Sequence, residues 1–302
     1  MDQKRIALIT GATAGIGRHA ALYLAARGFR VIATGRNADA LSELAVEAEG
    51  ELTPLRLDVT DQASIDSAVE VVERITNGHG VDVLVNNAGY GDIAPMESTT
   101  DKDLRAVFDT NVFGLMAVTR AFLPRMRERG DGRIVNVSSL GGLFTLPLFG
   151  AYNATKHAVE SMSDAMRIEL RPFGIEVSLI EPGPIRTKFS STSLKSVERY
   201  QDGSPYAPVL QRFADLTRRT DRMAPGPRAT SRAIHHAAAS RWPRPRYKLT
   251  LSSRLTVAFL RAIPTRLSDA ILRRVLRLTP KHLGVGASSS KPDRELTTSR
   301  AA

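Results

Sequence analysis

The chain has 302 residues and a hydrophobic fraction of 42%, which is ordinary for a soluble globular protein of one or two domains. It contains no cysteine, which excludes disulfides, thiolate metal sites and cysteine nucleophiles. The sequence shows no signal peptide and no run of ~18 apolar residues that would span a membrane. We therefore expect a cytoplasmic protein.

The formal net charge of +11 is concentrated near the C-terminus. Residues 1–217 carry 23 Lys and Arg against 27 Asp and Glu, whereas residues 218–302 carry 19 against 4. Such asymmetry is typical of a solvated basic face or a disordered tail. It also fits association with a membrane surface or, less readily, with nucleic acid.

Short apolar runs alternate with amphipathic stretches through the first 180 residues. Repeated βα units of this kind predict an α/β fold, a doubly wound Rossmann-type, mostly parallel sheet with helices on both faces. The expected strands are 4–10, 30–34, 52–57, 81–85, 133–137 and 175–180, and the expected helices are 15–27, 38–49, 62–76, 101–129 and 152–170.

The rhythm changes after residue 181, where a substrate loop and a helical extension are expected. We predict one domain over residues 1–283, with the substrate loop at about 188–246, a basic helical extension at about 251–283 and a disordered tail at 284–302. Within these parts the pattern predicts an irregular segment at 190–208, helices at 208–222 and 228–240, a strand at 247–251, and a helical stretch at 254–278 that Pro264 breaks in two.

A glycine-rich loop with the sequence TGATAGIG lies at residues 10–17, between the first strand and the first helix. Gly11 would allow a tight turn, Gly15 a close backbone approach, and Gly17 close packing of helix on sheet. The helix N-terminus would then present free N–H groups and partial positive charge to a pyrophosphate. The loop predicts a dinucleotide site, and a purely structural turn is the alternative.

The residues after the second strand discriminate between the two nicotinamide cofactors. An acidic residue there would bind the ribose 2′-hydroxyl and repel a 2′-phosphate, but this chain has Arg36. Arg36 could bind the phosphate bidentately, with help from Arg18. We therefore expect NADP(H) to be preferred over NAD(H). The alternatives are a solvated loop arginine at 36 and an exposed helix arginine at 18.

Tyr152 and Lys156 are four residues apart, about one helical turn, so they project from the same face of a helix. An ammonium beside a phenol stabilises its ionised form, which makes the phenol a usable proton donor or acceptor near neutral pH. Ser139 lies thirteen residues earlier, beyond a predicted strand. With the glycine-rich loop, this pattern indicates a nucleotide-dependent oxidoreductase.

Taken together, these motifs resemble the short-chain dehydrogenases/reductases with a Thr-Gly-xxx-Gly-x-Gly loop. The resemblance covers roughly residues 4–190, and the C-terminal region loosely resembles steroid- and retinol-type members. No departure from the family's catalytic pattern is visible. The motifs occur in order as Thr10–Gly17, Asp58-Val59, Asn86–Gly89, Asn111, Ser139, Tyr152 with Lys156, and Pro182-Gly183 followed by Thr187.

The resemblance implies a catalytic set of four residues. Tyr152 would exchange a proton with the substrate oxygen, and Lys156 would lower the Tyr152 pKa and bind the nicotinamide ribose. Ser139 would hydrogen-bond the substrate oxygen, while Ser138 would be structural. Asn111 would hold a water that links the lysine to solvent. Seen alone, Asn111 is also a plausible helix residue bonding its own backbone.

The same resemblance implies a cofactor site. Asp58 and Val59 would flank the adenine, the 86–89 loop would close over the adenosine, and Thr187 would hold the carboxamide. Seen alone, Asp58 and Thr187 are plausible caps or turn residues, and 86–89 is a plausible bare turn. The expected cofactor contacts are Gly11, Thr13, Ala14, Gly15, Ile16, Gly17, Arg18, Arg36, Asp58, Val59, Asn87, Ala88, Gly89, Tyr152, Lys156, Pro182, Gly183, Ile185 and Thr187.

Apolar residues on either side of the catalytic helix are candidates to line a substrate pocket, and ordinary packing of a lid is the alternative. Collectively they suggest a hydrophobic alcohol or ketone of steroid, retinoid, fatty or terpenoid type. The basic segment 254–278 could lie on a membrane surface and deliver such a compound. The candidates are Leu143, Phe144, Leu146, Leu148, Phe149, Phe189, Leu194, Tyr200, Tyr206, Val209, Leu210 and Phe213.

The function expected from the sequence is NADP(H)-dependent interconversion of a carbonyl and an alcohol on a hydrophobic substrate. A 3-oxoacyl-(carrier protein or CoA) reductase and a non-catalytic, cofactor-sensing binding protein are the rivals. The six histidines form no metal pattern, so we expect no catalytic metal. Family members commonly pair through two long helices, here near 101–129 and 152–170, which implies a homodimer or homotetramer.

Overall fold

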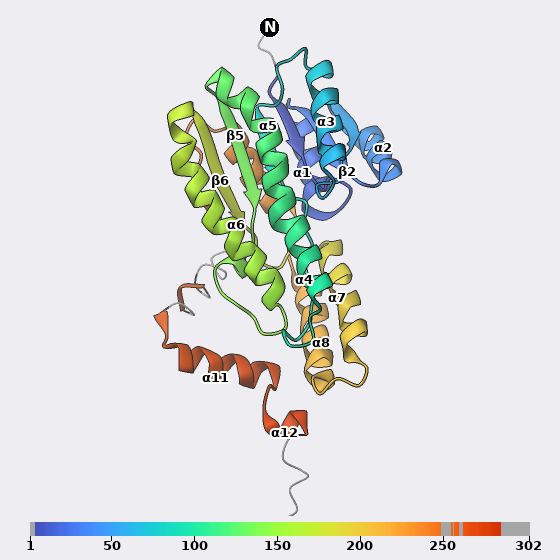
Figure 1. The fold of residues 1–302 in the computed structure, drawn as a ribbon, viewed down its shortest axis with the longest axis vertical. Coiled ribbons are helices and arrows are strands. Elements are labelled where there is room, and N and C mark those ends of the chain that lie inside the picture. Colours follow the sequence, from blue (N-terminus) through green and yellow to red (C-terminus); the bar gives the residue numbers. More distant parts are fainter. Residues whose placement is uncertain (1–3, 249–254, 256, 260–261, 285–302) are drawn as a thin grey trace, which may run out of the picture.

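The computed structural model describes residues 4–248, 255, 257–259 and 262–284. Its centre is a seven-stranded sheet in the order β3-β2-β1-β4-β5-β6-β7, and each neighbouring pair is parallel (Figure 1). The doubly wound Rossmann-type fold predicted from the sequence is confirmed. The strands are β1 (Ile6–Ile9), β2 (Arg30–Gly35), β3 (Leu52–Arg56), β4 (Val83–Asn86), β5 (Gly132–Val137), β6 (Ile175–Glu181) and β7 (Arg246–Lys248).

Helices cover both faces of the sheet and gather beyond its carboxyl edge, toward which β5 points in Figure 1. In chain order they are α1 (Gly15–Ala25), α2 (Ala38–Glu47), α3 (Gln62–Ile75), α4 (Asp101–Phe108), α5 (Leu115–Arg129), α6 (Gly150–Glu169), α7 (Lys188–Gln201), α8 (Ala207–Met223), α9 (Arg228–Ala239), α11 (Thr265–Leu276) and α12 (Pro280–Leu283).

Strands β1 to β6 each contribute to two apolar cores because successive side chains point to opposite faces of the sheet. Ala7 and Ile9 of β1 pack in one core with residues of α1, α2 and α9. Ile6 and Leu8 of the same strand pack in the other core with residues of α3, α5 and α6. Burial on both faces explains why the strands read as continuous apolar runs.

The order of the strands places a crevice at the end of β1. Strand β1 pairs with β2 on one side and with β4 on the other. The connection that follows β1 and the connection that follows β4 therefore run apart from each other at this edge of the sheet. Ligands of open α/β sheets bind in such a crevice, at the carboxyl ends of the strands. The glycine-rich loop and the Asn86–Gly89 segment both begin there.

The long helix predicted over 101–129 is present as one helical stretch, but a π-helical turn at Asp109–Gly114 lies in its middle, between α4 and α5. The wider turn accommodates two local contacts. Asn111 bonds the backbone of Tyr90, and Gly114 packs so tightly that a Cβ would lie 2.7 Å from the Val59 carbonyl oxygen. The whole stretch is long and apolar enough to cross a membrane, but α5 packs on β4 and β5 as a core helix does.

The irregular segment predicted over 190–208 is also wrong, since α7 occupies most of it. Thr187 caps this helix by accepting a hydrogen bond from the Phe189 N–H at 3.2 Å. The hydroxyl of Ser196 is buried and bonds the backbone of Ile93. A serine-rich stretch with weak helix propensity is therefore held as a helix by its cap and its tertiary contacts.

The C-terminal predictions are only partly covered by the described residues. The strand expected at 247–251 is represented by β7, and residues 249–251 lie outside the described part. Pro264 directly precedes α11, as the predicted break requires. The tail predicted to be disordered, 284–302, lies outside the described residues except for Gly284.

Candidate active site

The glycine-rich loop makes the tight turn that its sequence predicts. Gly11 and Gly15 have φ angles of +66° and +57°, which residues with a side chain rarely adopt. A Cβ at Gly17 would lie 2.4 Å from both the Asn87 Nδ2 atom and the Gly11 carbonyl oxygen. Only glycine therefore allows α1 to begin this close to the end of β4.

The 86–89 segment is a brace and not a bare turn. The Thr10 hydroxyl accepts hydrogen bonds from the N–H groups of Asn87 and Ala88, at 2.9 and 3.0 Å. The Asn87 side chain donates back to the carbonyl of Thr10 at 2.9 Å. Asn86 donates to Thr119 and Asn136 across the buried side. These bonds hold the ends of β1 and β4 together at the crevice.

The N-terminus of α1 fits a phosphate group. Its N-cap residue, Ala14, makes no side-chain cap hydrogen bond, and the first turn holds no acidic residue. The first N–H groups of this described helix are thus available to an anion. A Cβ at Gly15 would lie 3.3 Å from the Cβ of Thr187, so the 182–187 segment closes the other side of the loop. The shape of this cradle suits a dinucleotide.

The two arginines predicted to bind a 2′-phosphate differ in their surroundings. Arg36 is exposed directly beyond β2. Arg18 pairs with Glu47 of α2. Although burial opposes it, hydrogen bonds from Thr60 and the charges of Arg36 and Arg56 keep the pKa of Asp58 below its usual value. Asp58 therefore sits as an ionised turn residue close to Arg36.

Lys156 is anchored at the end of β5. Its ammonium donates to the carbonyl of Val137 at 2.9 Å and is nearly enclosed. A Cβ at Gly89 would lie 2.9 Å from Asn111 Oδ1 and 3.7 Å from Lys156 Nζ, so the asparagine and lysine side chains meet beside Gly89. The alternative that Asn111 bonds its own helix is wrong, because its amide pairs with Tyr90 and Thr155.

Tyr152 lies beside Ser139, as the spacing of the motif predicts. Ser139 lies close enough to lower the pKa of the Tyr152 phenol, and Ser139 Oγ accepts from the Gly141 N–H at 3.0 Å. A Cβ at Gly141 would be 3.3 Å from the Tyr152 ring and 3.5 Å from Ser139 Oγ. Ser138, in contrast, is buried on the inner side of the loop. The structure thus brings Asn111, Ser139, Tyr152 and Lys156 together at one edge of the sheet.

Aromatic rings cover the Tyr152 phenol. The ring centroids of Phe149 and Phe189 lie 4.7 and 5.4 Å from that of Tyr152, and Phe213 stands behind Phe149 at 6.1 Å. Burial raises the pKa of Tyr152 to about 12, against a lowering by the hydrogen bond with Ser139. Burial also lowers the pKa of Lys156 to about 8. The expected lowering of the Tyr152 pKa is absent here because the phenol is shielded from water.

The apolar residues predicted to line the substrate pocket fall into two groups. Val209 and Leu210 are fully enclosed in a small core that joins α7 and α8, so they pack the lid and do not line a pocket. Phe149 and Phe189 face Tyr152. Ordinary lid packing is therefore the better description of the first group, while the second group forms the apolar wall of the site.

A charge cluster behind the catalytic helix was not predicted from the sequence. Glu160 lies one turn beyond Lys156 and accepts from Arg246 Nη2 at 3.1 Å. Arg246 also bonds Asp164 and lies 3.1 Å from the enclosed carboxylate of Glu181. The four-residue spacing on α6 was a possible signal, but only β7 brings the arginine to it. The negative charge of Glu160 raises the pKa of Lys156, against the lowering by burial.

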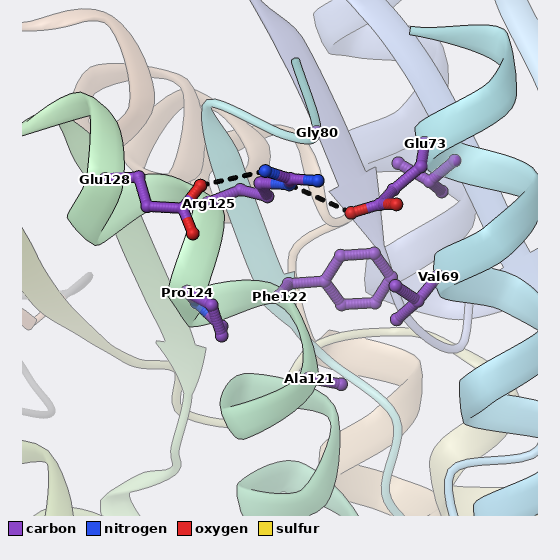
Figure 2. A pocket seen from close by; sticks show the side chains of 9 residues that line it. Val69, Glu73, Gly80, Ala121, Phe122, Pro124, Arg125 and Glu128 are labelled. Atoms are coloured by element: carbon purple, nitrogen blue, oxygen red, sulfur yellow. Dashed lines mark hydrogen bonds and ion pairs between the residues drawn. The ribbon is translucent and has the colours of Figure 1, made fainter. Parts of the chain in front are cut away.

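A cavity of about 270 Å³ lies between α3 and α5, apart from these residues (Figure 2). Figure 2 shows Arg125 at its edge, in ion pairs with Glu73 and Glu128. Val69 and Phe122 contribute apolar lining. No residue of the predicted site lines this cavity. The candidate site is therefore identified by the arrangement of residues around Tyr152 and not by the volume of a cavity.

Comparison with known proteins establishes the family of the chain. The family model for short chain dehydrogenases matches residues 5–198. Human 17-beta-hydroxysteroid dehydrogenase type 1 is 41% identical over 66% of this chain and 62% of its own length. The 3-ketodihydrosphingosine reductase of Bacteroides thetaiotaomicron is 33% identical over 91% of this chain and 98% of its own length.

Solved structures show the same fold. A short-chain dehydrogenase from Streptomyces avermitilis is 33% identical, covers 92% of this chain and 99% of its own, and superposes with a TM-score of 0.75. Other structural neighbours are complexes with NAD or with NADP. The comparisons therefore establish the fold and the family. Because the neighbours include complexes with either cofactor, the preference of this chain for NAD or NADP has to be argued from its own charged residues.

Glu160 is expected to set the pH range in which Lys156 stays charged. Because the pKa of Lys156 is about 8, the rate of carbonyl reduction should fall as pH rises through that value. Glu160→Gln removes the neighbouring negative charge, so this limb of the profile of kcat/KM against pH should move to lower pH.

Asp164→Asn is the matched control, since it removes a more exposed carboxylate from the same arginine. In Asp164→Asn, the pH at which kcat/KM falls should stay near that of the unmodified protein. Equal shifts in both variants, with equal loss of thermal stability, would show that Glu160 serves only to hold the fold.

Proposed function

Since the chain belongs to the short-chain dehydrogenase family, we propose that it uses NADP(H) to interconvert a carbonyl and an alcohol on a hydrophobic substrate. The oxidoreductase class follows from the family and from relatives with that activity in their names. One observation carries the finer proposal: the phenol of Tyr152 is held beside Ser139 under the rings of Phe149 and Phe189.

The residues of this chain bind and orient the reactants. The glycine-rich loop and the N-terminus of α1 would hold the pyrophosphate, and Lys156 and Thr187 would hold the nicotinamide half. When bound, the nicotinamide supplies or accepts the hydride. The Ser139 hydroxyl would hydrogen-bond the substrate oxygen and so stabilise the charge that develops there. A dry pocket strengthens that bond, because few waters compete for it.

Tyr152 would give the proton to the substrate oxygen. With a pKa raised by burial to about 12, its phenol is protonated throughout the neutral range and is ready to donate. Lys156, with a pKa lowered by burial to about 8, can exchange protons with solvent near neutral pH. Asn111 lies beside Gly89, near Lys156, and its amide donates to the carbonyl of Tyr90. The protonated phenol can therefore serve as the acid in carbonyl reduction.

The surroundings of Tyr152 support an apolar substrate. Phe149 and Phe189 approach so closely that a Cβ at Gly91 would lie 2.8 and 2.9 Å from their ring tips. A charged group of a substrate would lose its hydration beside these rings. The rings offer no opposite charge that would compensate for this loss. Two relatives are named for a hydroxysteroid and for a ketodihydrosphingosine, both of which are lipophilic.

The proposal extends to assembly and place in the cell. Phe113 and Ile168, 60% and 68% exposed on the α5 and α6 side, support a homodimer or homotetramer that pairs through these helices. A cytoplasmic location fits the absence of cysteine from the sequence.

Tyr152→Phe should lower kcat/KM for a lipophilic ketone by about 10²- to 10⁴-fold, the usual contribution of a positioned proton donor. NADPH binding should change little, because the phenyl ring keeps the packing against Phe149 and Phe189. Tyr23→Phe on α1, far from the site, is the control for loss of a hydroxyl. Turnover by Tyr152→Phe equal to that control would remove Tyr152 from the chemistry.

Arg36→Asp should reverse the cofactor preference. Loss of a charge-assisted bond to the 2′-phosphate, worth roughly 1.5–3 kcal/mol, corresponds to about a 10- to 100-fold drop in kcat/KM for NADPH. Activity with NADH should be kept or should rise. Arg18→Ala should have a smaller effect, because Arg18 is already paired with Glu47. An unchanged NADPH-to-NADH ratio in Arg36→Asp would contradict the NADP(H) assignment.

Phe113→Asp should weaken self-association, because it places a charge in the apolar face between copies. Light scattering of the purified variant should then give a smaller mass than the unmodified protein. An identical mass would place the interface elsewhere.

A further inference from the structure

The basic C-terminal part exposes large apolar side chains. On α11, Leu267 and Val275 are 49% and 51% exposed and lie eight residues apart, on one side of the helix. Ahead of α11, Leu255 and Phe259 are 62% and 54% exposed. Four of the large apolar residues that the described part of the chain exposes thus gather in this short region. A gathering of this kind marks an interaction surface.

Arginines accompany these apolar residues. Arg266, Arg273 and Arg274 are exposed on α11, against a single acidic residue, Asp269. The surrounding residues 218–302 hold 19 Lys and Arg against 4 Asp and Glu. The outward side of α11 therefore combines apolar and cationic groups, which is the composition of helices that lie in the plane of a bilayer surface.

The inward side of the same region packs against the candidate active site. Leu276 is 4% exposed and belongs to the apolar core that holds α7 and α8, together with Phe213. Phe213 leads through Phe149 to Tyr152. Val257, 2% exposed, packs on Leu140 and Leu143, directly after Ser139. Leu276 thus belongs to the core behind Phe149, and Val257 packs on residues that follow Ser139.

Figure 1 shows where this extension lies in the molecule. Helices α11 and α12 stand at one end of the long axis, beyond the carboxyl edge of the sheet and near α8. Residue Tyr152 lies in the first turn of α6, at the same edge of the sheet. A surface that contacted α11 would therefore face this end of the molecule.

We propose that α11, within the described residues 262–284, docks on an anionic lipid bilayer with its outward side in the headgroup region, so that a lipophilic substrate passes between bilayer and site. The proposal rests on the hydrophobic substrate proposed above. Anionic lipid matches the arginines, and the acyl boundary matches Leu267 and Val275. A second copy would bring a like-charged face against this one, and nucleic acid would leave the apolar residues without a partner.

The test is cosedimentation of the full-length protein with vesicles. We expect binding to vesicles of phosphatidylcholine with phosphatidylglycerol, and a marked loss of binding in phosphatidylcholine alone or in high salt. R273E/R274E should weaken binding at least about tenfold, because two cations are lost and two anions are gained near the lipid charge. L267E/V275E should weaken it to a similar degree by removing the apolar contact.

Two variants control for general effects of charge and polarity. R228E/R232E makes the same charge change on exposed positions of α9, and V46E places one glutamate on an exposed apolar position of α2. Both should bind as the unmodified protein does. Equal weakening by R228E/R232E and R273E/R274E would overturn the proposal in favour of non-specific attraction.

Other results would overturn the proposal in different ways. No binding to anionic vesicles contradicts it outright. A drop in oligomeric mass of L267E/V275E by light scattering would assign the face to a second copy, and cosedimentation with DNA that vesicles do not displace would assign it to nucleic acid. The α11 variants should turn over a water-soluble ketone without vesicles at the rate of the unmodified protein. A loss of vesicle binding in these variants can then be distinguished from a failure of the proposed chemistry.

Discussion

The hydrogen bond from the Lys156 ammonium to the carbonyl of Val137, 2.9 Å long, joins the catalytic helix to the end of the central strand β5. A buried ammonium must find such a partner, and this one fixes how α6 is rotated on the sheet. Tyr152, one turn earlier, is thereby placed beside Ser139, which follows β5 directly. The π-helical turn places Asn111 beside Gly89, where the Lys156 ammonium also lies. Helices thus position Asn111, Tyr152 and Lys156, and the end of β5 positions Ser139.

Burial acts on the two titrating groups in opposite directions, and both effects favour neutral side chains. The pKa of Tyr152 rises to about 12 and that of Lys156 falls to about 8. The aromatic rings that cover Tyr152 contribute to the first shift, and in the function that we propose they would also disfavour a charged substrate. Behind the helix, the negative charge of Glu160, which Arg246 holds in place, opposes the lowering of the Lys156 pKa by burial. In the proposed function, substrate class and pH dependence would therefore share one physical origin, the burial of Tyr152 and Lys156 at the end of β5.

Much of the fold and of the cofactor cradle could be predicted because local rules determine them. The apolar strand runs and the three glycines of the first loop depend on period and backbone conformation, which a sequence displays. Features that depend on tertiary partners could not be read in this way. Helix α7 forms from a serine-rich stretch because Ile93 and Thr187 bond it, and the π-helical turn forms where Asn111 meets Tyr90. The role of Glu160 required the position of Arg246, 86 residues away.

The most direct test of the central claim is the rate of NADPH oxidation by the purified protein with a panel of carbonyl compounds: a steroid ketone, retinal, a long-chain aldehyde and a 3-oxoacyl thioester. A dry, apolar site next to a protonated phenol predicts turnover of one of the lipophilic ketones or aldehydes, with NADH a much poorer donor. Turnover of the thioester alone would contradict the hydrophobic-substrate assignment, and the absence of turnover in either direction, with NADPH bound, would contradict the account of Tyr152 as a working proton donor.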